Sequence, residues 1–127
     1  MDEITLISEK VIGFSNNAIP WGMSVDEPNR LLFAALPNLN AIGVVDLDTL
    51  AHAATIPVGA CPYAIAVDPQ RRIGVATNQG TPSENATASV LDLCPVYSAL
   101  GRTVAGCSAT PASRRPLLAP ISISPLP

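Results

Sequence analysis

A segment that begins at Pro20 occurs twice in this chain, and this repeat constrains the fold more than any other feature. The sequence Pro-Trp-Gly-Met-Ser-Val-Asp at Pro20 returns as Pro-Tyr-Ala-Ile-Ala-Val-Asp at Pro62, an offset of 42 residues (62 − 20). Val-Val-Asp-Leu at Val44 returns as Val-Leu-Asp-Leu at Val90, an offset of 46 residues (90 − 44). Repeats of this length are typical of folds in which one small structural unit is stacked several times.

Short apolar runs alternate with turn residues in both copies, and none of them has the 3.6-residue period of a helix. Four short antiparallel strands joined by turns and apolar on both faces are typical of a β-propeller blade. The predicted fold class is therefore all-β, with antiparallel four-stranded propeller blades in an incomplete propeller, an open arc. The predicted strands are 22–25, 31–36, 41–45 and 53–58 in the first copy and 64–67, 73–77, 88–91 and 97–104 in the second.

The repeat also divides the chain into parts. We expect residues 1–18 to form a partial blade (a hairpin), residues 19–59 the first full blade and residues 60–107 the second. After Cys107 the pattern ends, and residues 108–127 hold five prolines but no Asp or Glu. Because proline is excluded from central strands, we interpret this last part as an irregular or disordered tail.

The formal net charge of −3 argues against a nucleic-acid partner, which clustered Lys and Arg would hold. No apolar run reaches the roughly 18 residues of a membrane span, and the first residues lack the pattern of a secretory signal. Cys61, Cys94 and Cys107 allow at most one intrachain disulfide, and we interpret all three as ordinary thiols.

Side chains that carry chemistry are few. His52 is the single histidine, and we interpret it as an exposed residue at the end of a strand. We assign the four aspartates that recur with the repeat to turn structure, because Asp after a strand bonds its own backbone. Trp21 and Tyr63 share one repeat position, where inter-blade packing is the expected role. These aspartates are Asp26, Asp46, Asp68 and Asp92.

The loops between the second and third strands are the best candidates for ligand binding. They contain amides and one carboxylate, which is few for a cation that takes six or more oxygen ligands. Loop formation is the alternative role for these residues, and Asn85-Ala-Thr also matches an N-glycosylation triplet. We predict no metal site, no cofactor and no catalytic residue. The candidate ligand-binding residues are Asn38, Asn40, Asn78, Glu84 and Asn85.

Two segments, Ile56-Pro-Val-Gly59 and Val75-Ala-Thr-Asn78, give the chain a resemblance to the YVTN-type β-propeller repeat family over residues 4–107. The resemblance implies six or seven blades in a whole protein and ligands on the loop face. It also implies a periplasmic, secreted or cell-surface location. Family members are binding proteins, lactonase-like enzymes, or domains beside cofactor-dependent oxidoreductases, and the chain holds about two and a half blades.

We therefore expect a propeller fragment that acts as a binding or interaction scaffold without catalysis of its own. The alternatives are a fragment of a propeller enzyme, lactonase-like or oxidoreductase-associated, and a truncated product without a selected function. Because an open arc leaves sheet faces and edges uncovered, the expected partners are further copies of the chain or other propeller blades. A protein or small-molecule ligand on the loop face is the further possibility.

Overall fold

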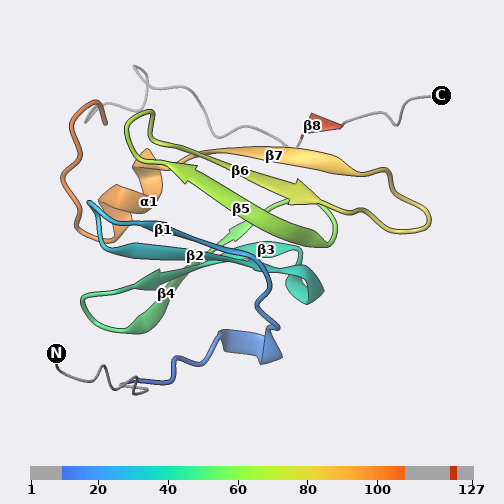
Figure 1. The fold of residues 1–127 in the computed structure, drawn as a ribbon, viewed down its shortest axis with the longest axis horizontal. Coiled ribbons are helices and arrows are strands. Elements are labelled where there is room, and N and C mark those ends of the chain that lie inside the picture. The colour runs from blue at the N-terminus through green and yellow to red at the C-terminus, as the bar shows by residue number, and fades with distance from the viewer. Residues whose placement is uncertain (1–9, 108–120, 123–127) are drawn as a thin grey trace, which may run out of the picture.

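The computed structural model describes residues 10–107 and 121–122, and these form two stacked four-stranded antiparallel sheets with one short α-helix and two 3-10 turns, Ser15–Asn17 and Pro37–Leu39 (Figure 1). Each sheet runs in chain order from one edge to the other. The first sheet contains β1 (Met23–Asp26), β2 (Leu31–Leu36), β3 (Ala41–Asp46) and β4 (Ala51–Pro57). The second contains β5 (Pro62–Asp68), β6 (Ile73–Asn78), β7 (Thr87–Asp92) and β8 (Ile121–Ser122), and helix α1 spans Cys94–Ala99.

The recurring aspartates close the turns, as the sequence predicts. The Asp26 carboxylate accepts a hydrogen bond from the Asn29 backbone N–H at 3.2 Å, and that of Asp68 accepts one from Gln70 at 3.0 Å. Arg30 and Arg72, which the repeat aligns, both adopt the left-handed conformation, with φ of 55° and 58°. The assignment of the recurring aspartates to turn structure is confirmed. The two copies share turn geometry as well as sequence.

The hydrophobic core lies between the two sheets. Phe33 and Val44 of the first sheet meet Ile65 and Leu91 of the second, and Tyr97 of α1 closes one end of the cluster. Strand β5 lies against β1 and β2, so the first strands of the two sheets run side by side. Each large apolar side chain buried in this way contributes about 1.5–3 kcal/mol. We call the two surfaces that meet here the junction faces and their opposite surfaces the outer faces.

The outer face of the first sheet is partly covered by the segment before β1. The ring of Phe14 lies on Gly43, where an added Cβ would be 2.9 Å from a ring carbon, and 5.1 Å from the His52 ring. A hairpin was expected over residues 1–18. Its first strand lies outside the described residues, and over 10–14 the structure has no strand but a side chain that packs onto the sheet.

The predicted strand at 97–104 is wrong, because α1 and a loop occupy this part of the chain. Pro95 at the start of the helix and Gly101 just after it, with φ of 74°, are ordinary helix start and stop signals. The fourth strand of the second sheet is instead β8, which pairs with β7. The other residues of the predicted tail lie outside the described part of the chain.

The interpretation of all three cysteines as thiols is also wrong. Cys94 and Cys107 form a disulfide with Cα atoms 5.4 Å apart, and Cys61 is a free thiol. The disulfide closes a loop that contains α1 and the residues after it. Within residues 10–107 and 121–122, no helix has the length and apolar character needed to cross a membrane.

Candidate functional site

Three connections meet at one end of the molecule, which we call the loop end: β2–β3 (37–40), β4–β5 (58–61) and β6–β7 (79–86). Hydrogen bonds tie them together. The Cys61 N–H donates to Asn40 Oδ1 at 2.9 Å, and the Gln79 N–H donates to the Cys61 carbonyl at 2.9 Å. The β4–β5 connection is therefore held between the other two loops, which makes the loop end one continuous surface.

Two predicted ligand-binding residues, Asn38 and Asn40, use their amides to hold backbone. Asn38 Oδ1 accepts from the Ile19 N–H at 2.9 Å, and its Nδ2 donates to the Asn17 carbonyl at 3.0 Å. Asn40 adopts the left-handed conformation that ends the β2–β3 loop. Both side chains are exposed, and their hydrogen bonds fix the approach of the chain to β1 and β5.

Asn78, the third predicted residue, is 2% exposed. Its Nδ2 donates to Thr87 Oγ1 and to Ser89 Oγ, both at 2.9 Å. Its Oδ1 has no hydrogen-bond partner within the described chain. The same Ser89 hydroxyl accepts from the Gly59 N–H at 3.1 Å. A Cβ at Gly59 would lie 2.7 Å from Asn78 Nδ2, so this polar cluster is packed tightly behind the loop surface.

Glu84 and Asn85, the last two predicted residues, lie on the exposed β6–β7 loop. The backbones of Glu84 and Thr81 exchange two hydrogen bonds of 3.1 Å and form a small turn there. Within the described ranges, no group of three or more His, Cys, Asp or Glu side chains is placed to hold a metal ion. The structure thus brings the amides of Asn38, Asn40 and Asn78 to one end of the molecule. It leaves Glu84 and Asn85 on the projecting β6–β7 loop.

An aromatic pair also lies at the loop end. The rings of Trp21 and Tyr63 meet edge to face, with centroids 5.1 Å apart and planes at 78°. They are 46% and 49% exposed. The Gly22 N–H donates to the Tyr63 carbonyl at 3.1 Å, which fixes β1 against β5 beside the rings. The pair joins the two sheets, and half of its surface remains open to a partner.

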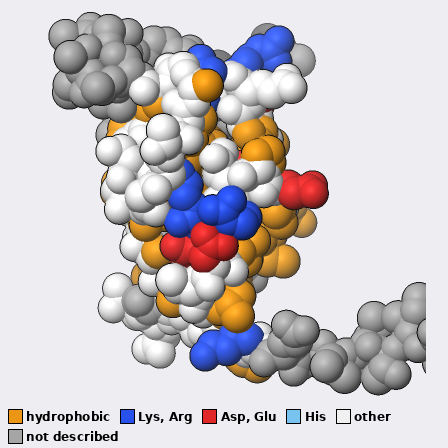
Figure 2. All heavy atoms as spheres, turned by 90° about the vertical axis from the view of Figure 1, so that its left-hand side faces the viewer, with side chains coloured by type: hydrophobic (Ala, Val, Ile, Leu, Met, Phe, Trp, Pro, Cys, Tyr) orange, Lys and Arg blue, Asp and Glu red, His pale blue; other side chains and the backbone are white. Residues whose placement is uncertain are grey.

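The opposite end, the turn end, carries most of the charged side chains in the described part of the chain. Arg102, from the loop after α1, donates to Asp46 Oδ1 at 2.7 Å and to the Asn29 carbonyl at 2.9 Å. Arg30 donates to Asp48 at 2.8 Å. Figure 2 shows basic and acidic side chains in contact near the centre of this end. The hydrogen bond from Arg102 holds the pKa of the Asp46 carboxyl below its usual value.

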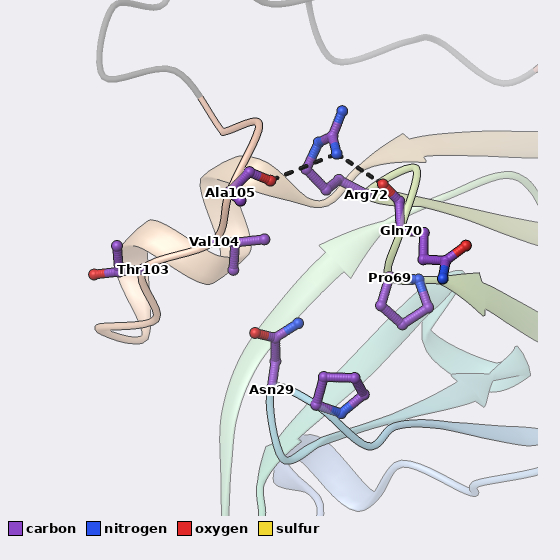
Figure 3. A pocket seen from close by; sticks show the side chains of 8 residues that line it. Asn29, Pro69, Gln70, Arg72, Thr103, Val104 and Ala105 are labelled. Atoms are coloured by element: carbon purple, nitrogen blue, oxygen red, sulfur yellow. Dashed lines mark hydrogen bonds between the residues drawn. The ribbon is translucent and has the colours of Figure 1, made fainter.

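A cleft of about 410 Å³ opens at the turn end between the two sheets and the loop after α1 (Figure 3). Arg72 lies on its wall, where Nη1 donates to the Gln70 carbonyl at 2.7 Å and to the Ala105 carbonyl at 3.5 Å. The repeat pattern did not predict this cleft, because the pattern places a strand where the loop after α1 lies. Its other lining residues are Pro28, Asn29, Pro69, Thr103 and Val104.

The Arg102–Asp46 pair gives a testable prediction. Both side chains are about one-tenth exposed, so Arg102→Met leaves a largely buried carboxylate unpaired and should lower the free energy of unfolding by about 2 kcal/mol. Because Arg102 lowers the pKa of folded Asp46, the stabilisation is present above the unfolded pKa of about 3.9 and is lost as pH falls below it.

Urea denaturation at neutral pH and at about pH 3, below the unfolded pKa, measures both effects. We expect Arg102→Met to reduce the loss of stability on acidification. Arg71→Met is the matched control, because Arg71 pairs with Asp68 at an exposed site and should change stability little. Equal stability of the wild type and Arg102→Met at both pH values would contradict the prediction.

Comparison with known proteins gives a fold likeness only. No family model matches the chain, and no curated protein matches it in sequence. Among solved structures, the chain is similar to hydrazine synthase of Kuenenia stuttgartiensis, with a TM-score of 0.51 and 20% sequence identity. The match covers 57% of this chain and 20% of that chain, so the chain corresponds to about a fifth of the length of this neighbour. The likeness supports a mostly antiparallel β fold.

Proposed function

We propose that the chain is a propeller-type repeat unit that acts as a binding scaffold without catalysis of its own. The arrangement of two stacked four-stranded sheets with a shared sequence repeat supports the propeller assignment. The likeness to hydrazine synthase supports the antiparallel β part of this assignment. The proposed binding surface is the loop end, centred on Trp21 and Tyr63.

The exposure of the aromatic pair is the observation that carries this proposal. Buried aromatic pairs stabilise a core, but Trp21 and Tyr63 each keep about half of their surface open. Trp and Tyr are the residues that most often dominate binding energy, because a rigid ring buries much area at little entropic cost. A half-exposed pair fixed by a backbone hydrogen bond is therefore suited to receive an apolar group.

The surrounding polar groups favour a rigid surface. The amides of Asn38 and Asn40 hold the backbone near Ile19 and Cys61, and Asn78 is buried behind the loop. These hydrogen bonds position the aromatic rings before any ligand arrives, which reduces the entropic cost of binding. The ligand class that fits is a peptide, or a small molecule, with an apolar ring that packs on Trp21 and Tyr63.

A phage-displayed peptide library is the probe that tests this proposal. We expect peptides selected on the wild type to bind Trp21→Ala and Tyr63→Ala at least about 10-fold more weakly, as hot-spot truncations do. Trp21 is the single tryptophan of the chain, so its fluorescence should shift when a peptide binds. Val11→Ala is the control, because Val11 is apolar and 85% exposed but lies outside the pair. Selected peptides that bind all four proteins equally would refute the assignment of this surface.

A further inference from the structure

Because the chain repeats, the outer faces of its two sheets are equivalent in sequence to the two faces that pack together in the junction. Inside the molecule, Ile65 of β5 packs onto the junction face of the first sheet and is only 6% exposed. At an offset of 42 residues, Ile65 corresponds to Met23 and Val67 to Val25. Met23 and Val25 are 61% and 53% exposed. The outer face of the first sheet thus exposes the repeat equivalents of side chains that the second sheet packs into the junction.

The complementary surface is the outer face of the second sheet. Ala66, Val75 and Val90 are cross-strand neighbours in the register of β5, β6 and β7, and side chains opposite one another in a sheet share a face. Ala76, next to Val75, is buried in the junction, so Val75 and its neighbours lie on the outer face. Ala66 is exposed, and Val75 and Val90 are half-buried.

This outer face repeats the surface on which Ile65 packs. Val75 corresponds to Phe33 at the offset of 42, and Val90 corresponds to Val44 at the offset of 46. Phe33 and Val44 form the junction face of the first sheet. The outer face of the second sheet is therefore equivalent to a surface that already receives a sheet of the same repeat within this chain.

We propose that a second copy of this chain packs β1 of its first sheet onto the outer face of the second sheet and reproduces the internal junction between chains. Met23 and Val25 of one copy lie on Ala66 and Val75 of the other. The contact joins two different surfaces, so it is heterologous, and the pair of copies retains one free surface of each kind, one on each copy. Such contacts form rings when the rotation between copies closes, and open chains when it does not.

The aromatic pair supports the same orientation. Within the chain, Tyr63 of the second sheet packs on Trp21 of the first. Because Trp21 and Tyr63 are equivalent in the repeat, the head-to-tail contact places Trp21 of the second copy beside Tyr63 of the first. The internal row of aromatic rings then continues across the interface.

Two features of the structure limit the contact. Phe14 covers Gly43 on the outer face, and Ala34 and Leu36 of β2 are fully buried there, so the strip along β1 is the part offered to a partner. Gly22, where a Cβ would be 2.8 Å from the Tyr63 carbonyl oxygen, corresponds to Ala64 in the second copy of the repeat. The partner strand must therefore sit slightly farther from β5 than β5 sits from β1.

A pair of charge variants tests the proposal by sedimentation velocity at micromolar concentrations. Met23→Glu blocks one surface and Ala66→Glu blocks the other, and each should weaken association about 30-fold or more because an unpaired charge is buried. Ala53→Glu is the matched control, because Ala53 is exposed on β4 and the substitution should leave association unchanged.

Mixing the two blocked variants distinguishes the proposed contact from a symmetric one. Met23→Glu keeps an intact second sheet and Ala66→Glu keeps an intact β1, so the mixture should form one-to-one dimers that do not grow. A monomeric wild type, or variants that assemble as the wild type does, would overturn the proposal. Both variants retain Trp21 and Tyr63, so selected peptides should still bind them, and failure here leaves the proposed scaffold function separately testable.

Discussion

Replacing both Cys94 and Cys107 with alanine is expected to lower the free energy of unfolding by about 3 kcal/mol, the value for a crosslink that closes a loop of this size. The disulfide spans a sequence separation of 13 residues. It fixes the segment that supplies Arg102 to the turn end and Val104 to the cleft wall. Without the crosslink the unfolded chain gains conformational freedom, and the folded segment loses its second point of attachment.

Urea denaturation with and without a dithiol reductant measures this contribution. The reductant should destabilise the wild type by a similar amount and leave the double alanine variant unchanged. Cys61→Ala is the control, because Cys61 is the free thiol and its removal should have a small effect under both conditions. A wild type that is equally stable with and without the reductant would show that the crosslink contributes nothing to folding.

The regular part of the fold could be predicted from the sequence because both copies of the repeat contain the same order of strands and turns. The strands found at Leu31–Leu36 and Ile73–Asn78 begin with similar apolar segments, Leu-Leu-Phe-Ala and Ile-Gly-Val-Ala. The aspartates after the strands form the turn hydrogen bonds expected of them. Where the second copy departs from the first, extending the pattern of the first copy gave a wrong prediction. The repeat placed a strand at 97–104, although Pro95 and Gly101 mark the start and the end of a helix.

The candidate site was less predictable, because exposure depends on neighbours that lie far apart in the sequence. The pattern placed Trp21 and Tyr63 at one repeat position, but only the packing of β1 against β5 shows that each ring remains half exposed. The disulfide was missed for the same reason, since the sequence does not show that the fold brings the Cα atoms of Cys94 and Cys107 to 5.4 Å. The cleft depends on the loop after α1, so an incorrect strand there hid it.

Replacing Tyr97 with alanine is expected to cost about 4 kcal/mol, as the loss of a fully buried aromatic side chain does. Tyr97 is completely buried, and its hydroxyl donates to Asp26 Oδ2 at 2.5 Å. Asn29 Nδ2 donates to both oxygens of the same carboxylate at 3.0 Å. The phenol thus joins α1 to the first sheet through a buried carboxylate, and alanine would leave a cavity and take one donor from Asp26.

Tyr97→Phe separates the two contributions, because it keeps the ring and removes only the hydroxyl. We expect a cost of about 1–3 kcal/mol, since Asp26 stays buried with one donor fewer. Burial and the hydrogen bond to Asp26 raise the pKa of Tyr97. The unfolded chain therefore releases this proton first, and the stability that Tyr97 supplies is lost as pH rises above the unfolded value of about 10.

Urea denaturation between neutral pH and about pH 11 should show a steeper decline in the free energy of unfolding for the wild type than for Tyr97→Phe. Parallel declines would show that the hydroxyl is not coupled to folding, and an Ala variant as stable as the Phe variant would show that the ring does not fill the junction.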